Sequence, residues 1–247
     1  MDSPVLLTND DGINAPGIQA LREAVSPRWP TVLVAPDREQ SASSHALTLN
    51  RPLRANQIDA MTIAVDGTPT DCVMLAFKGL LETRPAFVIS GINNGANLGD
   101  DVIYSGTVAA AAEATVLGVP AVAVSLVEPE VTDLAWCSQM TASIVEKVMH
   151  QTMPKGVFLN VNFPPRWTGG TFEVTTLGSR SYRDVIIEKN DPRGRPYYWI
   201  GGHVNEWIGG ESCDFASIAR GNISITPLYL DMTAIHVLDE IRSWSFE

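Results

Sequence analysis

Short apolar runs alternate with helix-like patterns through the first two-thirds of the chain. Runs rich in valine, isoleucine and leucine predict buried strands, and apolar residues at helical spacing predict helices. The expected strands are 5–8, 32–35, 87–90, 121–126 and 157–161, and the expected helices are 17–25, 105–117 and 132–149. Continuous apolar strands separated by helices are typical of a largely parallel sheet covered on both faces. The pattern therefore predicts a doubly wound α/β fold.

The segment between the second and third of these strands departs from the pattern. HALTLNRPLRA and MTIAVDG read as a short extended excursion. A helix is expected to follow from Pro69, because proline suits a first helical turn, with Thr68 or Thr70 as its cap.

Extended runs joined by turns replace the α/β pattern after about residue 171, and NDPRGRP is the strongest turn signal. A lone two-stranded hairpin is marginal in water, so we expect this one to pack on another subunit; packing on its own domain is the alternative. Met232 to about Trp244 has a helical pattern. We predict one domain over 1–247, with an α/β core to about 176, an extended hairpin and oligomerisation region over about 177–230, and a C-terminal helix over about 231–247.

Composition and charge narrow the classes of partner. With 45% hydrophobic and 18% charged residues, the whole chain is expected to fold. A formal charge of -11, from 17 Lys and Arg against 28 Asp and Glu, argues against binding long nucleic acid through its phosphates. A small phosphorylated substrate stays compatible, because a pocket that holds a cation binds an anion inside an acidic protein.

Neither a targeting nor a membrane segment is predicted. The three cysteines are far apart and form no CxxC pair, which favours a reducing compartment. The chain start lacks the basic and apolar regions of a secretory signal. Glu113, Gly118 and Pro120 interrupt the most apolar stretch, which reads as a buried helix and a strand. We expect a cytoplasmic protein with no membrane partner.

Two adjacent carboxylates, Asp10 and Asp11, follow the first expected strand directly. In an α/β sheet, ligands bind beyond the carboxyl ends of the strands, and the segments after the other strands are also rich in Asp, Asn, Ser and Gly. Two carboxylates held together repel unless a cation lies between them. Oxygen ligands suit Mg²⁺ or Mn²⁺, so the candidate ligands are Asp10, Asp11, Ser41 and one asparagine among Asn93, Asn94 and Asn97. A solvated acidic turn is the alternative for the Asp pair alone.

The turn Ser105-Gly106-Thr107 precedes an alanine-rich helix. The N-terminus of a helix binds anions through its free N–H groups and partial positive charge, so this turn is a candidate phosphate site. A simple helix cap by Ser105 or Thr107 is the alternative.

Three further residues have weaker signals. His45 lies in a polar segment after a strand and is either a proton donor or a hydrogen-bonded structural residue. Cys72 reads as a small buried apolar side chain, and Asp71 as a residue that holds a loop or a helix cap.

Taken together, the motifs resemble those of the SurE (survival protein E) nucleotidases. The matching segments, in order, are NDDGINAPGI, APDREQSASSHALTL, GTPTDCV, SGINNGANLGDDVIYSGTVAAA, LNVNFP, DPRGRPYYWIGG and SITPLYLDMTA. They extend over almost the whole chain, which makes the resemblance highly specific.

The resemblance implies a metal-dependent phosphomonoesterase that acts on nucleoside 5'- and 3'-monophosphates, with short polyphosphate as a further substrate. By motif position it implies one divalent cation held by Asp10, Asp11, Ser41 and Asn93, with Asp10 and Asp11 also catalytic. It further implies phosphate binding by Asn97 and by Ser105, Gly106 and Thr107. The resemblance also implies a Rossmann-like core with a projecting C-terminal hairpin that is exchanged between the subunits of a homodimer or tetramer.

Two departures from the usual family pattern concern substrate range. Ala42 stands where many members have glycine, and Gln40 where a basic residue is common. The usual TDF is here Cys213-Asp214-Phe215. A nucleotide-binding regulatory module with weak turnover is the alternative function.

Overall fold

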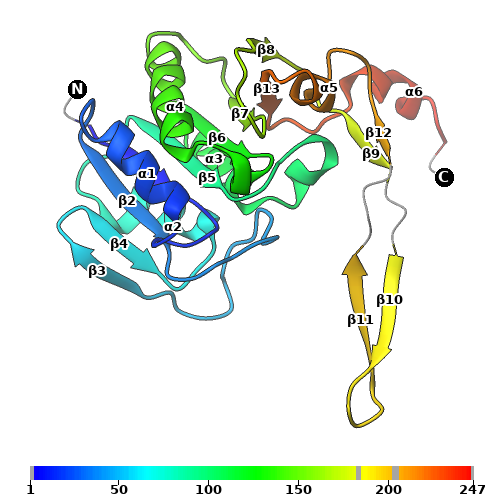
Figure 1. Cartoon of the computed structure of the whole chain (residues 1–247), viewed down its shortest axis with the longest axis horizontal. Helices are drawn as coiled ribbons and strands as arrows, with labels where there is room; N and C mark the ends of the chain where they lie inside the picture. The colour runs from blue at the N-terminus through cyan, green and yellow to red at the C-terminus, as the bar shows by residue number, and fades with distance from the viewer. Residues whose placement is uncertain (1–2, 182–184, 202–205, 246–247) are drawn as a thin grey trace.

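A nine-stranded mixed sheet forms the centre of the computed structural model, which describes residues 3–181, 185–201 and 206–245 (Figure 1). The strand order is β3-β4-β2-β1-β5-β6-β7-β13-β8. The strands are β1 Val5–Thr8, β2 Thr31–Pro36, β3 Ala55–Asp59, β4 Thr62–Val65, β5 Phe87–Asn93, β6 Ala121–Leu126, β7 Val157–Phe163, β8 Phe172–Val174 and β13 Ile223–Tyr229. The six central strands β4 to β7 in this order are parallel, as predicted, while β3 and β13 are antiparallel to their neighbours β4 and β7.

The first two-thirds of the chain contain four α-helices that cover both faces of this sheet. They are α1 Pro16–Val25, α2 Pro69–Leu75, α3 Gly106–Val116 and α4 Leu134–Met149. Shorter helical segments are η1 Ala76–Leu80, η2 Gly99–Ile103 and η3 Pro129–Val131. Helices α1 and α4 pack on one face, and α2 and α3 on the other. The doubly wound α/β prediction is therefore confirmed.

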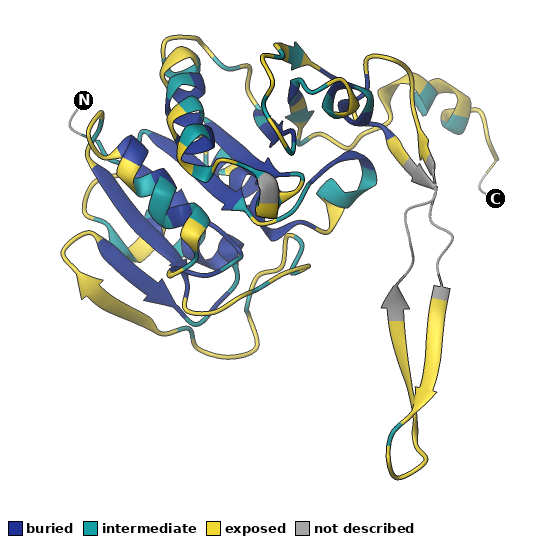
Figure 2. Cartoon of the chain, in the orientation of Figure 1, coloured by how far each residue is buried: buried dark blue, intermediate teal, exposed yellow. Residues whose placement is uncertain are grey.

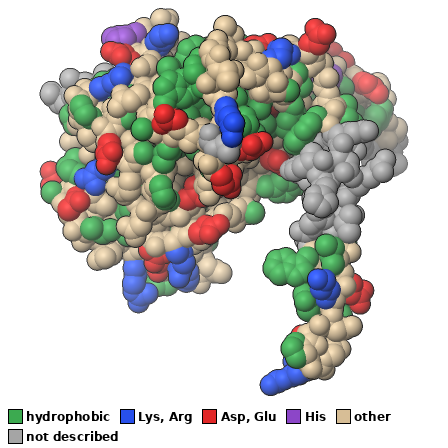
Figure 3. All heavy atoms as spheres, in the orientation of Figure 1, with side chains coloured by type: hydrophobic (Ala, Val, Ile, Leu, Met, Phe, Trp, Pro, Cys, Tyr) green, Lys and Arg blue, Asp and Glu red, His purple; other side chains and the backbone are tan. Residues whose placement is uncertain are grey.

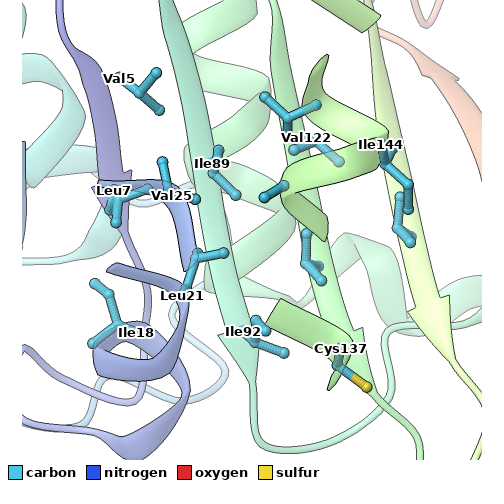
Figure 4. Close-up of a cluster of buried hydrophobic side chains, with 14 of the residues drawn as sticks. Val5, Leu7, Ile18, Leu21, Val25, Ile89, Ile92, Val122, Cys137 and Ile144 are labelled. Atoms are coloured by element: carbon cyan, nitrogen blue, oxygen red, sulfur yellow. The ribbon is translucent and has the colours of Figure 1, made fainter. Parts of the chain in front are cut away.

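The core consists of two apolar clusters, one on each face of the sheet. Successive side chains of a strand point to opposite faces, so Val5 and Leu7 of β1 join one cluster and Leu6 joins the other. Figure 4 shows the first cluster, in which Ile18 and Leu21 of α1 meet the strands. Figure 2 shows the buried strands between the two helical layers. This packing fixes the ends of the strands that carry the polar segments.

The C-terminal third differs from the predicted division in two respects. The prediction placed 223–229 in the extension, but β13 lies in the main sheet between β7 and β8. A short helix, α5 Asp214–Ala219, was not expected. These residues return to the core because β13 continues the sheet beyond β7 and buries Ile223.

The hairpin is present and projects from the core (Figure 1). It consists of β10 Val185–Asn190 and β11 Pro196–Gly201, joined at the predicted DPRG turn. At its base, β9 Ser179–Ser181 pairs with β12 Glu206–Ile208. Figure 3 shows hydrophobic side chains gathered on the projecting part.

The C-terminal helix is shorter than predicted. A 3-10 turn, η4 Ile235–Val237, precedes α6 Leu238–Arg242, whereas 232–244 was expected to be helical. None of the α6 residues is buried, and a helix gains most of its stability from packing an apolar face, so the end of the chain forms little more than one turn. Within the described residues, no helix is long and apolar enough to cross a membrane.

Candidate active site

The acidic pair lies at the carboxyl edge of the sheet, directly after β1. Strands β2 and β5 pair with β1 on either side, so the chain reverses its direction of winding at this point. Such a switch point opens a crevice in which α/β proteins bind their ligands. The turn is shaped by Asn9, whose side-chain N–H donates to the carbonyl of Gly12 at 2.9 Å. Gly12 has a φ of 98°, which glycine adopts without strain.

Asp10 is buried, with 5% of its surface exposed, and both of its carboxylate oxygens accept hydrogen bonds from Thr107. The Thr107 hydroxyl donates to Oδ1, and the Thr107 backbone N–H donates to Oδ2 at 3.2 Å. Burial raises the pKa of Asp10, and the Thr107 bonds partly offset this rise. The first turn of α3 thus fixes the orientation of Asp10.

Asp11 is more accessible than Asp10 and has a different partner. Its Oδ2 accepts a hydrogen bond from the backbone N–H of Asn94 at 3.0 Å. Burial, together with the negative charges of Asp10 and Glu39 and against the lowering effect of the Asn94 bond, raises the pKa of Asp11 to about 6. Three carboxylates therefore repel one another at this edge, and a bound cation would relieve that repulsion.

Ser41 and Asn93 lie beside groups that contact the acidic pair. The backbone N–H of Gln40 donates to the Asp10 carbonyl at 2.7 Å, which brings the turn containing Ser41 to Asp10. The Ser41 hydroxyl is exposed and donates to Glu39 Oε1 at 2.6 Å. Asn93 is the last residue of β5; its Nδ2 donates to the carbonyl of Gly95 at 2.8 Å, which leaves Oδ1 as an acceptor.

The donor set at this edge fits a hard divalent cation. Asp10, Asp11, Ser41 and Asn93 offer carboxylate, hydroxyl and amide oxygens, the ligands that Mg²⁺ and Mn²⁺ prefer. The set contains only two acidic residues and is supplemented by neutral oxygens. Among the described residues, no group of three or more His, Cys, Asp or Glu is arranged to hold a metal ion.

The first turn of α3 has the predicted cap and an unusually close approach to Asp10. Ser105 is the N-cap, and its Oγ accepts from the Val108 N–H at 3.1 Å. A Cβ at Gly106 would lie 2.6 Å from Ser43 Oγ and 3.0 Å from Asp10 Cβ, so only glycine fits. Ser43 Oγ is buried and has no hydrogen-bond partner among the described residues. The Gly106 N–H, which is engaged in none of these bonds, and this hydroxyl are donors suited to a phosphate oxygen.

Asn97 lies in a buried network at the ends of β6 and β7. Its Nδ2 donates to Ser125 Oγ at 2.7 Å, and its backbone N–H donates to Asn162 Oδ1 at 2.9 Å. Its carbonyl accepts from the side chains of Asn160 and Asn162. These bonds stabilise the loop between β5 and η2, and none of them involves Asp10. Phosphate binding by Asn97 stays a prediction.

Of the weaker candidates, His45 forms a pair that supports its structural interpretation. His45 Nε2 lies 2.8 Å from Glu113 Oε2, and the Glu113 side chain is only 7% exposed on α3. The contact between His45 and Glu113 joins the segment that follows β2 to α3. Both lie near the acidic edge, the carboxyl edge of the sheet that carries Asp10 and Asp11.

Asp71 caps α2 and ties down the same segment, as expected. Its Oδ2 accepts from the backbone N–H of Thr68, whose hydroxyl in turn accepts from the Asp71 N–H. Thr48 donates to both Asp71 oxygens through its N–H and its hydroxyl. Cys72 is fully buried and unpaired.

Sequence reasoning missed two features of this site. Glu39 was not singled out, although it stands two residues before Ser41 and its charge acts on both aspartates. Thr107 was expected to bind phosphate, whereas its two donors bond to Asp10. A carboxylate close to the predicted ligands was a usable signal for Glu39, but no sequence pattern indicates which acceptor the Thr107 donors meet.

Replacing Thr107 by valine tests its bond to Asp10. The motifs imply metal-dependent release of phosphate from nucleoside monophosphates. We expect Thr107→Val to lower the rate of this release roughly 10- to 100-fold, because partners that orient a metal ligand typically contribute this much. Thr107→Ser keeps a hydroxyl donor and should retain most activity. Steady-state rates at several metal concentrations check this, and equal rates for the valine and serine variants would contradict it.

Ala42 adopts a left-handed backbone conformation with a φ of 56°. The left-handed conformation strains an alanine by about 1–2 kcal/mol. A glycine avoids this strain but lowers the stability by roughly 0.4–1 kcal/mol, because it gives the unfolded chain more conformational freedom. Ala42→Gly is therefore expected to stabilise the protein by up to about 1 kcal/mol, and Ala42→Val to destabilise it. Urea unfolding measures both changes, and a less stable glycine variant would show that the left-handed conformation of Ala42 costs less than the added freedom of glycine in the unfolded chain.

The fold and the site define a class of protein: a doubly wound α/β protein in which a pair of carboxylates and the N-terminus of a helix meet at one switch point of the sheet. The comparisons with known proteins make this specific. The model of the family described as Survival protein SurE matches residues 5–184. This chain belongs to the SurE family, so the resemblance inferred from its motifs is confirmed.

Individual relatives and a solved structure extend the match to nearly the whole chain. A protein of Geotalea daltonii named 5'-nucleotidase SurE is 50% identical over 243 residues, covering 97% of this chain and 98% of the relative. A protein of Xanthomonas campestris pv. campestris with the same name is 49% identical over 245 residues, covering 97% and 95%. The crystal structure of the SurE protein from Aquifex aeolicus superposes with a TM-score of 0.86 at 40% identity, covering 97% of this chain and 98% of that chain.

Proposed function

We propose that this protein is a 5'-nucleotidase, a phosphomonoesterase that hydrolyses nucleoside monophosphates to nucleoside and phosphate. The observation that carries the proposal is the pairing of Asp10 with the first turn of α3. Through Thr107, a buried carboxylate and a phosphate-type helix N-terminus meet at one point. The names of the relatives from Geotalea and Xanthomonas support the same activity. Hydrolysis of 3'-monophosphates and of short polyphosphate belongs to the proposal as the finer part of the substrate range.

The side chains around Asp10 and Asp11 have separate roles in binding the metal and in orienting the attacking water. Asp10, Asp11, Ser41 and Asn93 would hold one divalent cation, Mg²⁺ or Mn²⁺. When bound, such a cation polarises a phosphoryl oxygen and offsets the negative charge of the transition state. Thr107 keeps Asp10 in one orientation. Asp11, the more exposed carboxylate, is positioned to orient the attacking water.

The remaining groups act on the phosphate. The free N–H of Gly106 and the hydroxyls of Ser43 and Ser105 lie at the N-terminus of α3 and stabilise negative charge there. Asn97, held by the β6 and β7 asparagine network, is the further residue that we propose to contact phosphate. A water molecule attacks phosphorus and the bond from phosphorus to the nucleoside oxygen breaks. The attacking water loses a proton, and the nucleoside oxygen takes one up, so that nucleoside and phosphate are released.

A panel of metals and substrates tests the proposal. The purified protein is incubated with nucleoside 5'- and 3'-monophosphates and tripolyphosphate, with Mg²⁺, Mn²⁺ or a chelator, and released phosphate is measured. We expect release from 5'-monophosphates that requires the metal. Binding of nucleotide without release in any metal would favour the alternative, a regulatory module.

The hairpin supports a homodimer or tetramer as the assembly. Tyr198 and Trp199 of β11 and Ile186 of β10 are 57%, 64% and 64% exposed, which is costly in water for side chains of this size. A second copy of the chain would cover them. The net charge of -11 supports a small anionic substrate over long nucleic acid, and the unpaired cysteines support a cytoplasmic location.

Replacing Trp199 by glutamate tests this assembly. We expect Trp199→Glu to lower the mass measured by light scattering from that of a dimer or tetramer toward a single chain, because the charge cannot be buried in an apolar contact. Lys189→Glu, on the same hairpin, is the control for added negative charge. An unchanged mass for Trp199→Glu would place the interface elsewhere.

A further inference from the structure

Ser43 lies in the connection between β2 and β3, residues 37–54, which contains neither a helix nor a strand. Such a connection lacks the regular backbone pairing of a strand, so individual contacts have to place its side chains. Ser43 Oγ is nevertheless buried, and a Cβ at Gly106 would lie only 2.6 Å from it. The contacts that hold the segment therefore decide whether this hydroxyl reaches a phosphate at the N-terminus of α3.

The backbone on both sides of Ser43 has a left-handed conformation. Ala42 has a φ of 56° and Ser44 a φ of 51°, and these are the two non-glycine residues with positive φ in the described part of the chain. This conformation is unfavourable for residues with a side chain and persists where surrounding contacts impose it. Contacts with neighbouring elements are therefore needed to keep Ser43 in place.

Three contacts after Ser43 supply this support. The Ser44 backbone N–H donates to the carbonyl of Tyr104 at 3.0 Å, and the Ser44 hydroxyl donates to the carbonyl of Ile103 at 2.8 Å. The third contact joins His45 Nε2 to Glu113 Oε2 at 2.8 Å. The first two tie the segment to the end of η2, and the third ties it to α3.

Glu113 is an unusual residue for its position in α3. It is the one charged residue of this alanine-rich helix, and its side chain is only 7% exposed. A carboxylate is costly to bury unless a partner compensates it, and an apolar side chain would cost less here. Because Glu113 follows Gly106 by about two helical turns, both lie on the same side of α3. The segment from Ser43 to His45 therefore follows this side of the helix.

We propose that Glu113, acting through His45, is a positioning residue for Ser43. The contact between His45 and Glu113 holds the strained backbone at Ser44, and this backbone directs the Ser43 hydroxyl to the phosphate bound at the N-terminus of α3. The hydroxyl then donates a hydrogen bond to a phosphate oxygen and stabilises the charge that develops there. The proposal rests on the proposed nucleotidase function.

Replacing Glu113 tests the proposal. Glu113→Met removes the acceptor for His45 but keeps a long side chain that suits a helix. We expect it to lower kcat/KM for adenosine 5'-monophosphate about 10-fold. Glu113→Gln keeps an acceptor and should stay within about 3-fold of the native protein. Equal values for the methionine and glutamine variants would contradict the proposal.

A matched control and a second variant separate positioning from a loss of folding. Glu146→Met is the control, because Glu146 of α4 is 55% exposed and pairs with Arg28 at the surface, so kcat/KM should not change. His45→Leu breaks the same contact from its exposed side and should lower kcat/KM as much as Glu113→Met. Unchanged kcat/KM in His45→Leu, with thermal midpoints measured for each variant, would overturn the proposal.

A double-mutant cycle asks whether Glu113 acts through Ser43. Ser43→Ala is expected to lower kcat/KM about 10- to 30-fold. Adding Glu113→Met to Ser43→Ala should lower it less than about 2-fold further, because the hydroxyl that Glu113 positions is already absent. A purely structural role of Glu113 predicts that the two effects multiply. Multiplied effects, or native kcat/KM in Ser43→Ala, would show that the proposal is wrong.

A binding measurement distinguishes this proposal from the proposed function. Inorganic phosphate is titrated into each variant with Mg²⁺ present, and calorimetry gives its Kd. We expect Ser43→Ala and Glu113→Met each to raise Kd about 5-fold, and the double variant to raise it no further. This pattern in a protein that releases no phosphate from nucleotides would support the positioning and reject the nucleotidase. Phosphate release by the native protein with the same Kd in all variants would reject the positioning alone.

Discussion

The Asp10→Asn variant is expected to release phosphate from nucleoside monophosphates at least about 100-fold more slowly than the native protein, at every concentration of Mg²⁺ or Mn²⁺. The substitution keeps the shape of the side chain and an acceptor for Thr107, so the fold should be preserved. It removes one of the two adjacent carboxylate charges that make a cation favourable at this edge.

The same variant should lose a second property, stabilisation by metal. In the native protein, Asp10, Asp11 and Glu39 repel one another, and burial raises the pKa of both aspartates. A bound cation relieves this repulsion, so added Mn²⁺ should raise the thermal midpoint of the native protein, with the shift growing with metal concentration. In Asp10→Asn the shift should be much smaller or absent.

Scanning calorimetry with and without metal, together with phosphate release, measures both effects. Asp239→Asn is a matched control, because this carboxylate is 94% exposed on α6 and forms a surface ion pair with Arg242. Native-like activity and an unchanged metal shift in Asp10→Asn would show that Asp10 does not hold the cation.

The second large effect is expected at Asp214, the aspartate in the segment that departs from the usual TDF. The side chain is fully buried, and its two oxygens accept three backbone N–H groups. Gly99 donates to Oδ2 at 2.7 Å, and Gly178 and Phe215 donate to Oδ1 at 2.9 Å. These bonds join the start of η2, the base of the hairpin region and α5.

Asp214→Asn should lower the free energy of unfolding by about 2–3 kcal/mol, because an amide group in place of one oxygen leaves at least one buried N–H without an acceptor. Asp214→Ala, which removes all three acceptor contacts, should cost more. Urea unfolding gives the free energy, and hydrogen exchange should become faster at the Gly99 and Gly178 amides before other amides of the core.

Asp133→Asn provides the comparison for this measurement. Asp133 is the N-cap of α4 and accepts the Trp136 N–H at 3.0 Å, a single bond that asparagine also accepts well. Its substitution should change the stability by only a few tenths of a kcal/mol. Equal stabilities of Asp214→Asn and Asp133→Asn would mean that the three bonds to Asp214 contribute little.

The sequence predicted the elements whose signals are local. Leu7 in an all-apolar run and Pro69 in a first helical turn are strong signals, and both predicted elements are present. The C-terminal elements were harder to predict. The run that contains Ile223 could be read as part of a hairpin or of the sheet, because an edge strand and a projecting strand have the same alternating pattern. Only the presence of β7 as a partner decides between them.

In the candidate site, too, some features have a local signal in the sequence and others depend on the tertiary structure. Adjacent carboxylates at Asp10 and Asp11 and the glycine at 106 are visible as motifs, because their chemistry depends on residue type and on position after a strand. The sequence by itself therefore determined the α/β fold and the family, and it predicted the kind of chemistry at the edge of the sheet that carries Asp10 and Asp11.

Only the tertiary structure decided which groups meet. It directs both Thr107 donors to Asp10, adds Glu39 to the charges around the pair, and joins His45 to Glu113. The physical reason is that these contacts join segments separated by tens of residues. Their distances depend on how the two helical layers pack on the sheet, and no local pattern in the chain carries that information.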